Sequence, residues 1–427
     1  MILLVVSTPV TAAEHGEILD QDLNGQGQGY TVLRVWGSHY EMGHAQAELL
    51  GDAMVDGLNQ VQAYVGGAYE SLRQLMAVTV WMPPEIEDEF DGIVDCLAVS
   101  HPEEDIDELD VKVACTLGEW LYGCRSHTCW GRYVADPVRT LSTRRLDFST
   151  VIPMMTHHVL CAYEPDNGSP RWVSLTWPGI ITLVQGVNEF GTLVSLHDYK
   201  SGGADLTAGR MPRMVAARYA LTYATDPDVS THLPAVWDEL RGYEIMTGSF
   251  VNYYAPEGWG GVMTGWPWQS GPDFHHLRPP HPDWHHGEAM ITTNMWTDGS
   301  YTPGDENFGA DAYYDEETPK TMESHWDLLA DAGNGLQQLS VACRGRGDLT
   351  IWADGRLSYG RTPRLEYEWS ELFPCTPGDV DGDGDVDTAD LLLLLGAWGD
   401  CPGCPEDINE DGVVNTADLL ILLGNWG

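Results

Sequence analysis

The stretch LYGCRSHTCWGRYVADPVRTLSTRRLDF, residues 121–148, decides how the rest of the chain is interpreted. Cys124 follows Gly123, and backbone cleavage between them would free a thiol nucleophile together with an α-amino group that takes its proton near neutral pH. Further along the same stretch come Arg144 and Asp147. A guanidinium beside a sulfur favours the thiolate, and a carboxylate holds a guanidinium or an ammonium in place. The stretch therefore predicts Cys124 as a nucleophile, with Arg144 and Asp147 as supporting charges.

Strand alternation sorts these charged residues into two faces. It places Arg145 and Asp147 on one face of their strand and Arg144 on the other, unless a bulge intervenes. A structural ion pair is the alternative interpretation of Arg144 and Asp147.

The same alternation separates Cys124 from His127 and from the rival nucleophile Cys129, which we therefore interpret as a core residue. Two asparagines, Asn188 and Asn294, each end a β-like run, where a side-chain amide can point at a reacting carbonyl. Turn formation is their alternative role, because Asn ends strands well and tolerates the left-handed conformation.

Several motifs in a fixed order resemble one family, the acyl-coenzyme A:isopenicillin N acyltransferase-like cysteine hydrolases of the N-terminal-nucleophile superfamily. The resemblance covers roughly residues 30 to 370. It rests on an opening motif and four later landmarks: Gly37 to Gly43, Cys124 to Gly131, Thr143 to Asp147, Gly186 to Gly191, and Thr292 to Asn294. The chain departs from the family at Ala47, which replaces a Gly, at Arg145, which replaces an Asn, and at Glu323 to Trp326, where a late arginine is missing.

The resemblance implies a fold and a set of roles. The fold would be α+β, a four-layer αββα sandwich. Cys124 would attack an amide or thioester carbonyl of a small N-acyl or acyl-thioester substrate, with no cofactor for catalysis. Asn188 and Asn294 would stabilise the tetrahedral oxyanion, and Arg144 and Asp147 would support the nucleophile.

A second pattern repeats near the C-terminus with a period of 28 residues, as DVDGDGDVDTADLLLLLGAWG from Asp379 and DINEDGVVNTADLLILLGNWG from Asp407. Each copy fits a twelve-residue calcium loop, with oxygen ligands at fixed positions and a glycine at position 6. The expected ligands are Asp379, Asp381, Asp383, Asp385, Asp387 and Asp390 in the first loop, and Asp407, Asn409, Asp411, Val413, Asn415 and Asp418 in the second. Asp385 and Val413 would bind through their backbone carbonyls.

Both copies end their loop with Asp and lead into one helix, features that resemble type I dockerin repeats. The resemblance implies a small α-helical module with EF-hand-like loops that binds two Ca²⁺ and a cohesin-like protein partner. A solvated acidic tail is the alternative interpretation. It is disfavoured because the same twelve-residue spacing of oxygen ligands occurs in both copies.

Charge and the N-terminus restrict the partners and the location. The formal net charge of −44 on 427 residues repels nucleic acid and anionic membranes, so neither is expected as a partner. Residues 1–13, MILLVVSTPVTAA, are typical of the end of a signal peptide without its basic start, which predicts an extracellular or periplasmic protein. Cys375, Cys401 and Cys404 flank the first repeat and predict one disulfide there, while Cys401 and Cys404 as a redox or metal pair are the weaker alternative.

The order of helical and β-like patterns predicts four segments. Residues 1–13 are the signal remnant, 14–123 a helical segment, 124–373 the catalytic core and 374–427 the calcium module. Two functions from different classes follow. The first is a secreted, self-processing amidase or acyltransferase tethered by its calcium module. The second is a non-catalytic calcium-binding scaffold or adhesion protein with an inert hydrolase fold.

Overall fold

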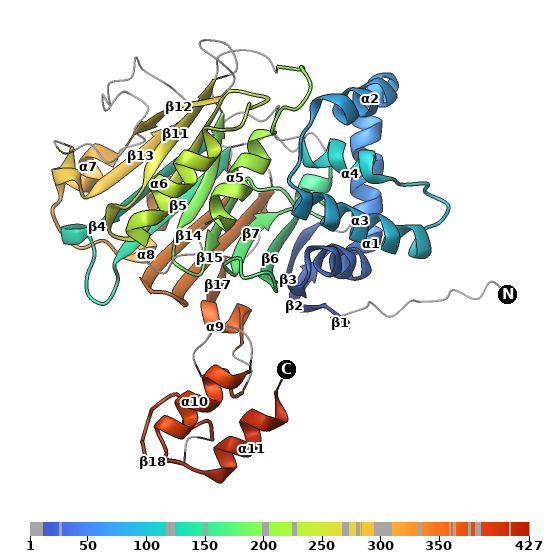
Figure 1. Cartoon of the computed structure of the whole chain (residues 1–427). Helices are drawn as coiled ribbons and strands as arrows, with labels where there is room; N and C mark the ends of the chain where they lie inside the picture. The colour runs from blue at the N-terminus through green and yellow to red at the C-terminus, as the bar shows by residue number, and fades with distance from the viewer. Residues whose placement is uncertain are drawn as a thin grey trace. The chain divides into compact units, whose positions relative to one another are not determined.

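The computed structural model of the chain mixes α and β structure and divides into two compact units, up to Trp369 and from Ser370 onward (Figure 1). The structure describes residues 12–24, 28–116, 119, 124–147, 153–198, 205–223, 229–266, 273–278, 282, 284–293, 310–330, 335–357, 360–361, 364–374, 377–380, 386–409 and 411–426.

The first unit contains a sheet of ten strands, which we call the first sheet. Its neighbouring strands are antiparallel except for β3 and β6, which run parallel. In sheet order they are β1 (Ala12–Ala13), β2 (Gly16–Leu23), β3 (Gly29–Gly37), β6 (His157–Pro165), β7 (Trp172–Thr176), β8 (Gln185–Asn188), β9 (Leu193–Asp198), β10 (Ser249–Tyr254), β11 (Gly261–Trp266) and β12 (Asp273–Arg278).

A second sheet of seven strands carries the stretch with which the sequence analysis began. Its strands are antiparallel, and the long β14–β15 hairpin turns at Gly347, whose φ of +66° favours glycine. In sheet order they are β13 (Ala289–Thr293), β4 (Cys124–Trp130), β5 (Thr140–Asp147), β14 (Gly335–Gly345), β15 (Asp348–Leu357) and β16 (Gly360–Arg361), with β17 (Leu365–Glu368) paired to β15.

The two sheets face each other. Contacts between β4 and β9 join them at one place, and a hydrogen bond from Gln185 to Gln337 joins β8 to β14 at another. Helix α5 (Arg213–Thr222) packs on β8, β9 and β10 of the first sheet, and α8 (Met322–Ala330) packs on β5 and β14 of the second. Layers of helix, sheet, sheet and helix therefore enclose the interior (Figure 1).

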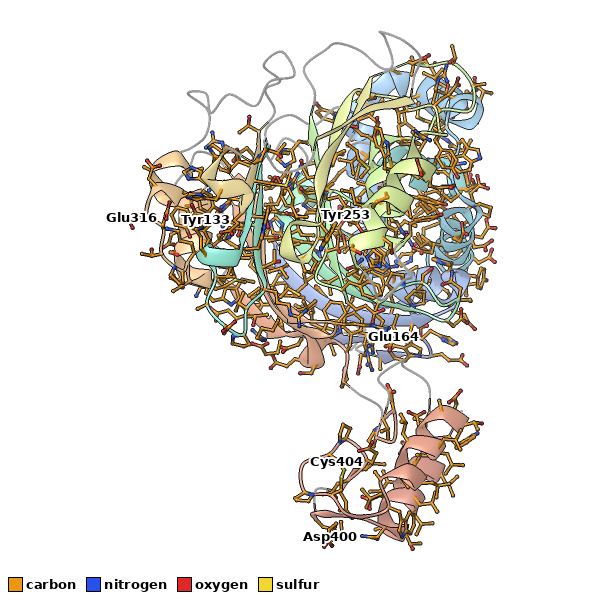
Figure 2. The ribbon with its side chains drawn as sticks, turned by 60° about the vertical axis from the view of Figure 1, so that its left-hand side comes forward. Tyr133, Glu164, Tyr253, Glu316, Asp400 and Cys404 are labelled. Atoms are coloured by element: carbon orange, nitrogen blue, oxygen red, sulfur yellow. A yellow bond between two sulfur atoms is a disulfide. The ribbon has the colours of Figure 1, made fainter. Side chains whose placement is uncertain are left out.

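Among the residues that the structure describes, apolar side chains form a larger and a smaller cluster in this unit. The larger one includes Tyr253 and fills the space around the first sheet and its helices. The smaller one includes Cys129, Tyr133 and Tyr314, and lies on the far face of the second sheet. Figure 2 labels one member of each cluster, Tyr253 and Tyr133. The two cysteines of β4, Cys124 and Cys129, thus belong to different clusters because they lie on opposite faces of the strand.

The segment expected to be helical, residues 14–123, instead begins with strands β2 and β3 of the first sheet. It then contains α1 (His39–Val65), α2 (Tyr69–Thr79), α3 (Pro84–Ser100) and α4 (Glu108–Cys115). Ser38 and Glu41 form a capping box that starts α1. Two glycines let α1 and α3 cross closely, since a Cβ on Gly43 or Gly92 would lie about 2.2 Å or 2.1 Å from a backbone oxygen of the other helix. The remaining helices of this unit are α6 (Val229–Leu240), α7 (Ala310–Asp315) and α9 (Trp369–Leu372), the last of which ends in the second unit.

The C-terminal unit holds two helices of equal length, α10 (Thr388–Gly396) and α11 (Thr416–Gly424), each begun by a capping box. Its small core consists of Val386, Leu394, Val414 and Leu422. Two short strands, β18 (Gly399–Asp400) and β19 (Val413–Val414), pair beside a disulfide between Cys401 and Cys404. Cys375 lies outside the described residues. Among the helices that the structure describes, none is both long and apolar enough to cross a membrane.

Candidate functional site

The candidate nucleophile, Cys124, is the first residue of β4 and is only 6% exposed. It pairs with Leu146 of β5, so Arg144, two residues along β5, lies on the same face of the second sheet. The Arg144 Nη2 donates a hydrogen bond to the Cys124 Sγ over 2.9 Å. The predicted pairing of this cysteine with this arginine is therefore present in the structure.

Arg144 is held in an unusual electrostatic setting. It is fully buried, and burial lowers the pKa of its guanidinium, an effect that the nearby Cys124 and Asp147 oppose. Its Nη2 also donates to the backbone carbonyl of Leu196 over 3.0 Å. Among the described residues, its Nε and Nη1 have no hydrogen-bond partner. A buried cation with so few partners stabilises negative charge on the neighbouring sulfur.

Asp147 lies on the opposite face of β5, as alternation predicted. It pairs with Arg145, whose Nε lies 3.0 Å from its Oδ1, and with Arg125, whose Nε lies 3.7 Å from its Oδ2. Arg145 also donates to the backbone carbonyl of Leu329 in α8. Asp147 thus acts on Arg144 through its charge, while its direct partners are the other two arginines.

A chain of buried polar side chains lies beside the nucleophile on the same face of β4. The Ser126 Oγ lies 3.0 Å from His197 Nε2 and 3.0 Å from the Tyr254 hydroxyl, which lies 2.8 Å from Thr292 Oγ1. Sequence reasoning missed these residues. Alternation from Cys124 points to Ser126, but no local pattern marks His197 or Tyr254, which reach the site from the other sheet.

The far face of β4 has a different environment. The His127 Nδ1 lies 2.7 Å from the Tyr314 hydroxyl, and the ring of His127 stacks on that of His325 at 3.7 Å. Burial lowers the pKa of His127 to about 3 and raises the pKa of the Cys129 thiol to about 12. Neither residue shares a face with Cys124, so neither serves it as a base or replaces it as a nucleophile.

The structure does not bring Asn188 to the nucleophile. Its Oδ1 accepts hydrogen bonds from the backbone N–H groups of Phe190 and Thr192, and its Nδ2 donates to the carbonyl of Leu221. This is the turn role that sequence analysis kept as the alternative. The turn packs on Cys343, which pairs with Thr140, at the end of β5 distant from Arg144.

Two residues of the expected site lie outside the described residues. They are Asn294, expected at the end of β13, and Gly123, expected on the acyl side of the cleaved bond. A cavity of about 520 Å³ lies elsewhere, lined in part by His39, Trp172 and Arg218, and Cys124 is not among its described lining residues.

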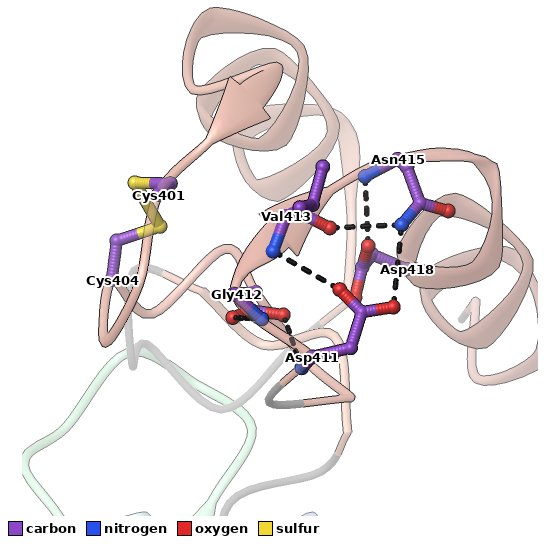
Figure 3. Close-up of a disulfide and its surroundings, with 8 residues drawn as sticks. Cys401, Cys404, Asp411, Gly412, Val413, Asn415 and Asp418 are labelled. Atoms are coloured by element: carbon purple, nitrogen blue, oxygen red, sulfur yellow. Dashed lines mark hydrogen bonds between the residues drawn. A yellow bond between two sulfur atoms is a disulfide. The ribbon is translucent and has the colours of Figure 1, made fainter.

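The second loop that the sequence predicts to bind calcium is described except for residue 410. Asp407 accepts from the backbone N–H of Asp411 and Gly412, and Asp411 accepts from that of Val413. Figure 3 shows Asp411, Val413, Asn415 and Asp418 drawn together at this turn. Gly412, at position 6, has a φ of +89°, as the sharp turn of such a loop requires.

Asp418, the last predicted ligand, ties the two ends of the loop together. Its two carboxylate oxygens accept from the backbone N–H of Asn409 over 3.1 Å and of Asn415 over 2.8 Å, and the residue is fully buried. Asp390 accepts in the same way from Val380 and Asp387 in the first loop. The ligands Asp381, Asp383 and Asp385 of that loop lie outside the described residues. The oxygen-rich donor set of the second loop fits a hard cation such as Ca²⁺.

Cys401 and Cys404 are unsuited to a second metal site. Cys401, Cys404 and Glu406 lie close enough together to share an ion. The two sulfurs are joined in a disulfide, so they offer no thiolate ligands.

Comparison with solved structures shows remote similarities of fold, among them the following one. The fold is similar to that of the Caenorhabditis elegans N-acylethanolamine-hydrolyzing acid amidase (NAAA) ortholog, with 12% sequence identity and a TM-score of 0.37, over 51% of this chain and 92% of that chain. No family model matches the chain. No curated protein matches it in sequence.

Proposed function

We propose that the chain is a self-processing cysteine amidase or acyltransferase of the N-terminal-nucleophile class, with the αββα sandwich of that class. It acts on the carbon–nitrogen bond of a small N-acyl compound. One observation carries this proposal: Cys124 begins strand β4 of the second sheet, and its sulfur lies 2.9 Å from the buried Arg144 guanidinium. The motifs that resemble the acyltransferase-like cysteine hydrolases support the same class.

Maturation would use the same sulfur as turnover. The Cys124 thiolate attacks the carbonyl carbon of Gly123, the C–N bond breaks as the acyl group moves to sulfur, and the nitrogen gains a proton. Water then hydrolyses the thioester, which leaves a carboxylate on Gly123 and a free α-amino group on Cys124. That amino group is the base for turnover.

In turnover, the thiolate attacks the substrate acyl carbon, and the α-ammonium gives its proton to the leaving amine. Water hydrolyses the resulting thioester, or another amine accepts the acyl group in a transfer. Arg144 stabilises the thiolate that starts each cycle.

N-terminal sequencing and intact-mass measurement of the purified chain test the proposal. We expect a fragment that begins Cys-Arg-Ser-His and stays associated with the preceding segment, and hydrolysis of a panel of N-acyl amides. Cys124→Ala should remain a single chain without activity. A wild-type chain that is intact and inactive on the panel would overturn the amidase proposal in favour of the non-catalytic scaffold. An intact and fully active chain would overturn the self-processing part.

The C-terminal unit is proposed to be a dockerin-like module that binds two Ca²⁺. The support is the second loop, in which Asp407, Asp411 and Asp418 accept hydrogen bonds from backbone groups of the loop that presents them. Bound Ca²⁺ would neutralise these carboxylates and fix the loop to the start of α11. Extracellular calcium loops bind with dissociation constants of about 10⁻⁴ to 10⁻³ M, so loops of this kind would suit an extracellular or periplasmic protein.

A protein partner for this module is supported by two matching apolar faces. Leu392 and Leu420, at equivalent positions of the two repeats, are each 65% exposed. Leu395 and Leu423 are each 49% exposed, and Trp398 and Trp426 follow at the next equivalent positions. Such exposed apolar residues are typical of interaction surfaces.

The proposed occupant of these faces is a cohesin-like domain, held in calcium and released by chelator. Binding to an immobilised cohesin domain would be measured for the wild-type chain and for Leu392→Asp with Leu420→Asp. Equal retention with calcium and with chelator would remove this part of the proposal.

A further inference from the structure

Two successive residues of β9, Leu196 and His197, contact Arg144 and the strand that carries Cys124, respectively. The backbone carbonyl of Leu196 accepts a hydrogen bond from Arg144 Nη2 over 3.0 Å, and that same Nη2 donates to Cys124 Sγ. The next residue, His197, has its Nε2 3.0 Å from Ser126 Oγ. Ser126 lies two residues after Cys124 on the same face of β4. One strand of the first sheet therefore holds both the arginine and the strand that carries the nucleophile.

The contact between His197 and Ser126 belongs to a longer bridge between the sheets. Tyr254 of β10 joins Ser126 of β4 and Thr292 of β13 through its hydroxyl. His197 and Tyr254 come from the first sheet, whereas Ser126 and Thr292 come from the second. All four residues are at most 3% exposed. A buried polar bridge of this kind fixes one relative placement of two sheets, which apolar contacts alone specify less sharply.

The charge state of His197 matters because of its neighbours. Burial and the positive charge of Arg144 hold the pKa of His197 well below its usual value, while the backbone of Cys124 acts in the opposite direction. His197 is therefore neutral at neutral pH, and the charge that acts on the Cys124 sulfur at this point is that of Arg144.

We propose that His197 is a positioning residue for Cys124. Through Ser126, it holds the first residues of β4 at the separation from Arg144 at which the guanidinium stabilises the thiolate. This inference rests on the proposed role of Cys124 as nucleophile. No sequence motif marks His197, and it acts on the second sheet from β9 of the first sheet.

The chain offers a matched control on the other face of the same strand. His127 is also a fully buried histidine, it belongs to β4 itself, and its pKa is also lowered by burial. It differs in its neighbours, Tyr314 and His325, which it meets on the face of β4 opposite to Cys124. A general loss of stability would affect both histidine variants, whereas a loss of positioning would affect only His197.

The test measures alkylation of Cys124 by iodoacetamide as a function of pH in the purified full chain, with labelled peptides quantified by mass spectrometry. The reaction forms a carbon–sulfur bond, releases iodide and reports the thiolate fraction directly. In His197→Phe we expect the rate at neutral pH to fall about tenfold and the pH midpoint to rise by about one unit. His197→Gln should keep most of the rate, because its amide can still bond to Ser126. His127→Gln should alkylate as the wild type does.

A second variant covers the case in which His197→Phe does not fold. Ser126→Ala removes the hydroxyl that joins β4 to His197 and leaves both the histidine and Arg144 in place. It should lower the rate about threefold in the same direction. A wild-type rate and pH midpoint in whichever of these two variants folds would overturn the positioning role.

The alkylation experiment tests the role of His197 separately from the proposed amidase activity. If the wild-type Cys124 alkylates with a low pH midpoint but the chain neither cleaves itself nor hydrolyses amides, the amidase proposal fails. The dependence of that midpoint on His197 would still support the positioning role.

Discussion

Cys124 and Cys129 lie on opposite faces of the same strand, five residues apart. Cys124 packs in the larger apolar cluster between the sheets, and Cys129 packs in the smaller one beside Tyr133 and Tyr314. Arg144 donates to the first sulfur, whereas burial raises the pKa of the second to about 12. One strand thus carries a cysteine in a cationic setting and another that stays a neutral thiol.

This difference predicts opposite results for two alanine variants. Cys129→Ala should mature and turn over as the wild type does, with stability lower by about 1 to 2 kcal/mol for the buried atoms that are lost. Cys124→Ala should neither cleave itself nor turn over. Gel analysis of fragments and a hydrolysis assay measure both. Loss of maturation in Cys129→Ala at unchanged folding would contradict the assignment of the nucleophile.

Arg144→Met should separate activity from stability. The variant removes a buried guanidinium whose Nε and Nη1 have no partner among the described residues, so stability should stay equal or rise by about 1 kcal/mol. Turnover should fall by about 100-fold or more, because the sulfur loses its cation. Thermal unfolding and turnover measured on the same preparation give the two numbers.

The neighbouring arginine is the control for that variant. Arg145 lies on the other face, paired with Asp147, so Arg145→Met should lower stability and affect turnover less. If Arg144→Met turned over at the wild-type rate, the 2.9 Å contact with Cys124 would have no role in catalysis.

Local alternation could predict the side of the strand on which each residue lies, and it did so for Arg144, Arg145 and Cys129. It could not predict His197, because that residue belongs to the other sheet, and the placement of one sheet on another depends on packing between distant segments. For Asn188 the motif is visible in the sequence, but it does not decide between two roles. Its Asn-Glu-Phe-Gly motif fits both an oxyanion donor and a turn. The hydrogen bond from its Nδ2 to the Leu221 carbonyl of α5 depends on how that helix packs, which the motif does not encode.

Buried histidines predict a loss of stability in mild acid. Burial lowers the pKa of His127 and His158 to about 3 and that of His157 to about 4, whereas an unfolded histidine titrates near 6.5. The unfolded chain therefore binds more protons than the folded chain below about pH 6.5. This contribution to stability is present above that pH and is lost as the pH falls toward 4 and then 3.

Urea unfolding at about pH 7.5 and about pH 5 measures the effect. We expect the free energy of unfolding to fall by an amount on the order of 2 kcal/mol for each buried histidine. His158→Gln should remove one such share of the difference, because glutamine does not titrate. His44→Gln, at a side chain that is 42% exposed, should leave the difference unchanged. An equal difference in His158→Gln and the wild type would show that other groups control the acid response.

Calcium stoichiometry tests the C-terminal unit in the intact chain. Equilibrium dialysis should find two ions per chain, with dissociation constants of about 10⁻⁴ to 10⁻³ M if the loops behave as extracellular ones do. Asp411→Ala should leave one ion, because it removes the position 5 carboxylate that also accepts from the Val413 backbone. Glu406→Ala, just before the loop, should keep two, which separates loss of a ligand from loss of surface charge. If the wild type bound no calcium, or Asp411→Ala still bound two ions, the ligand assignment would fail.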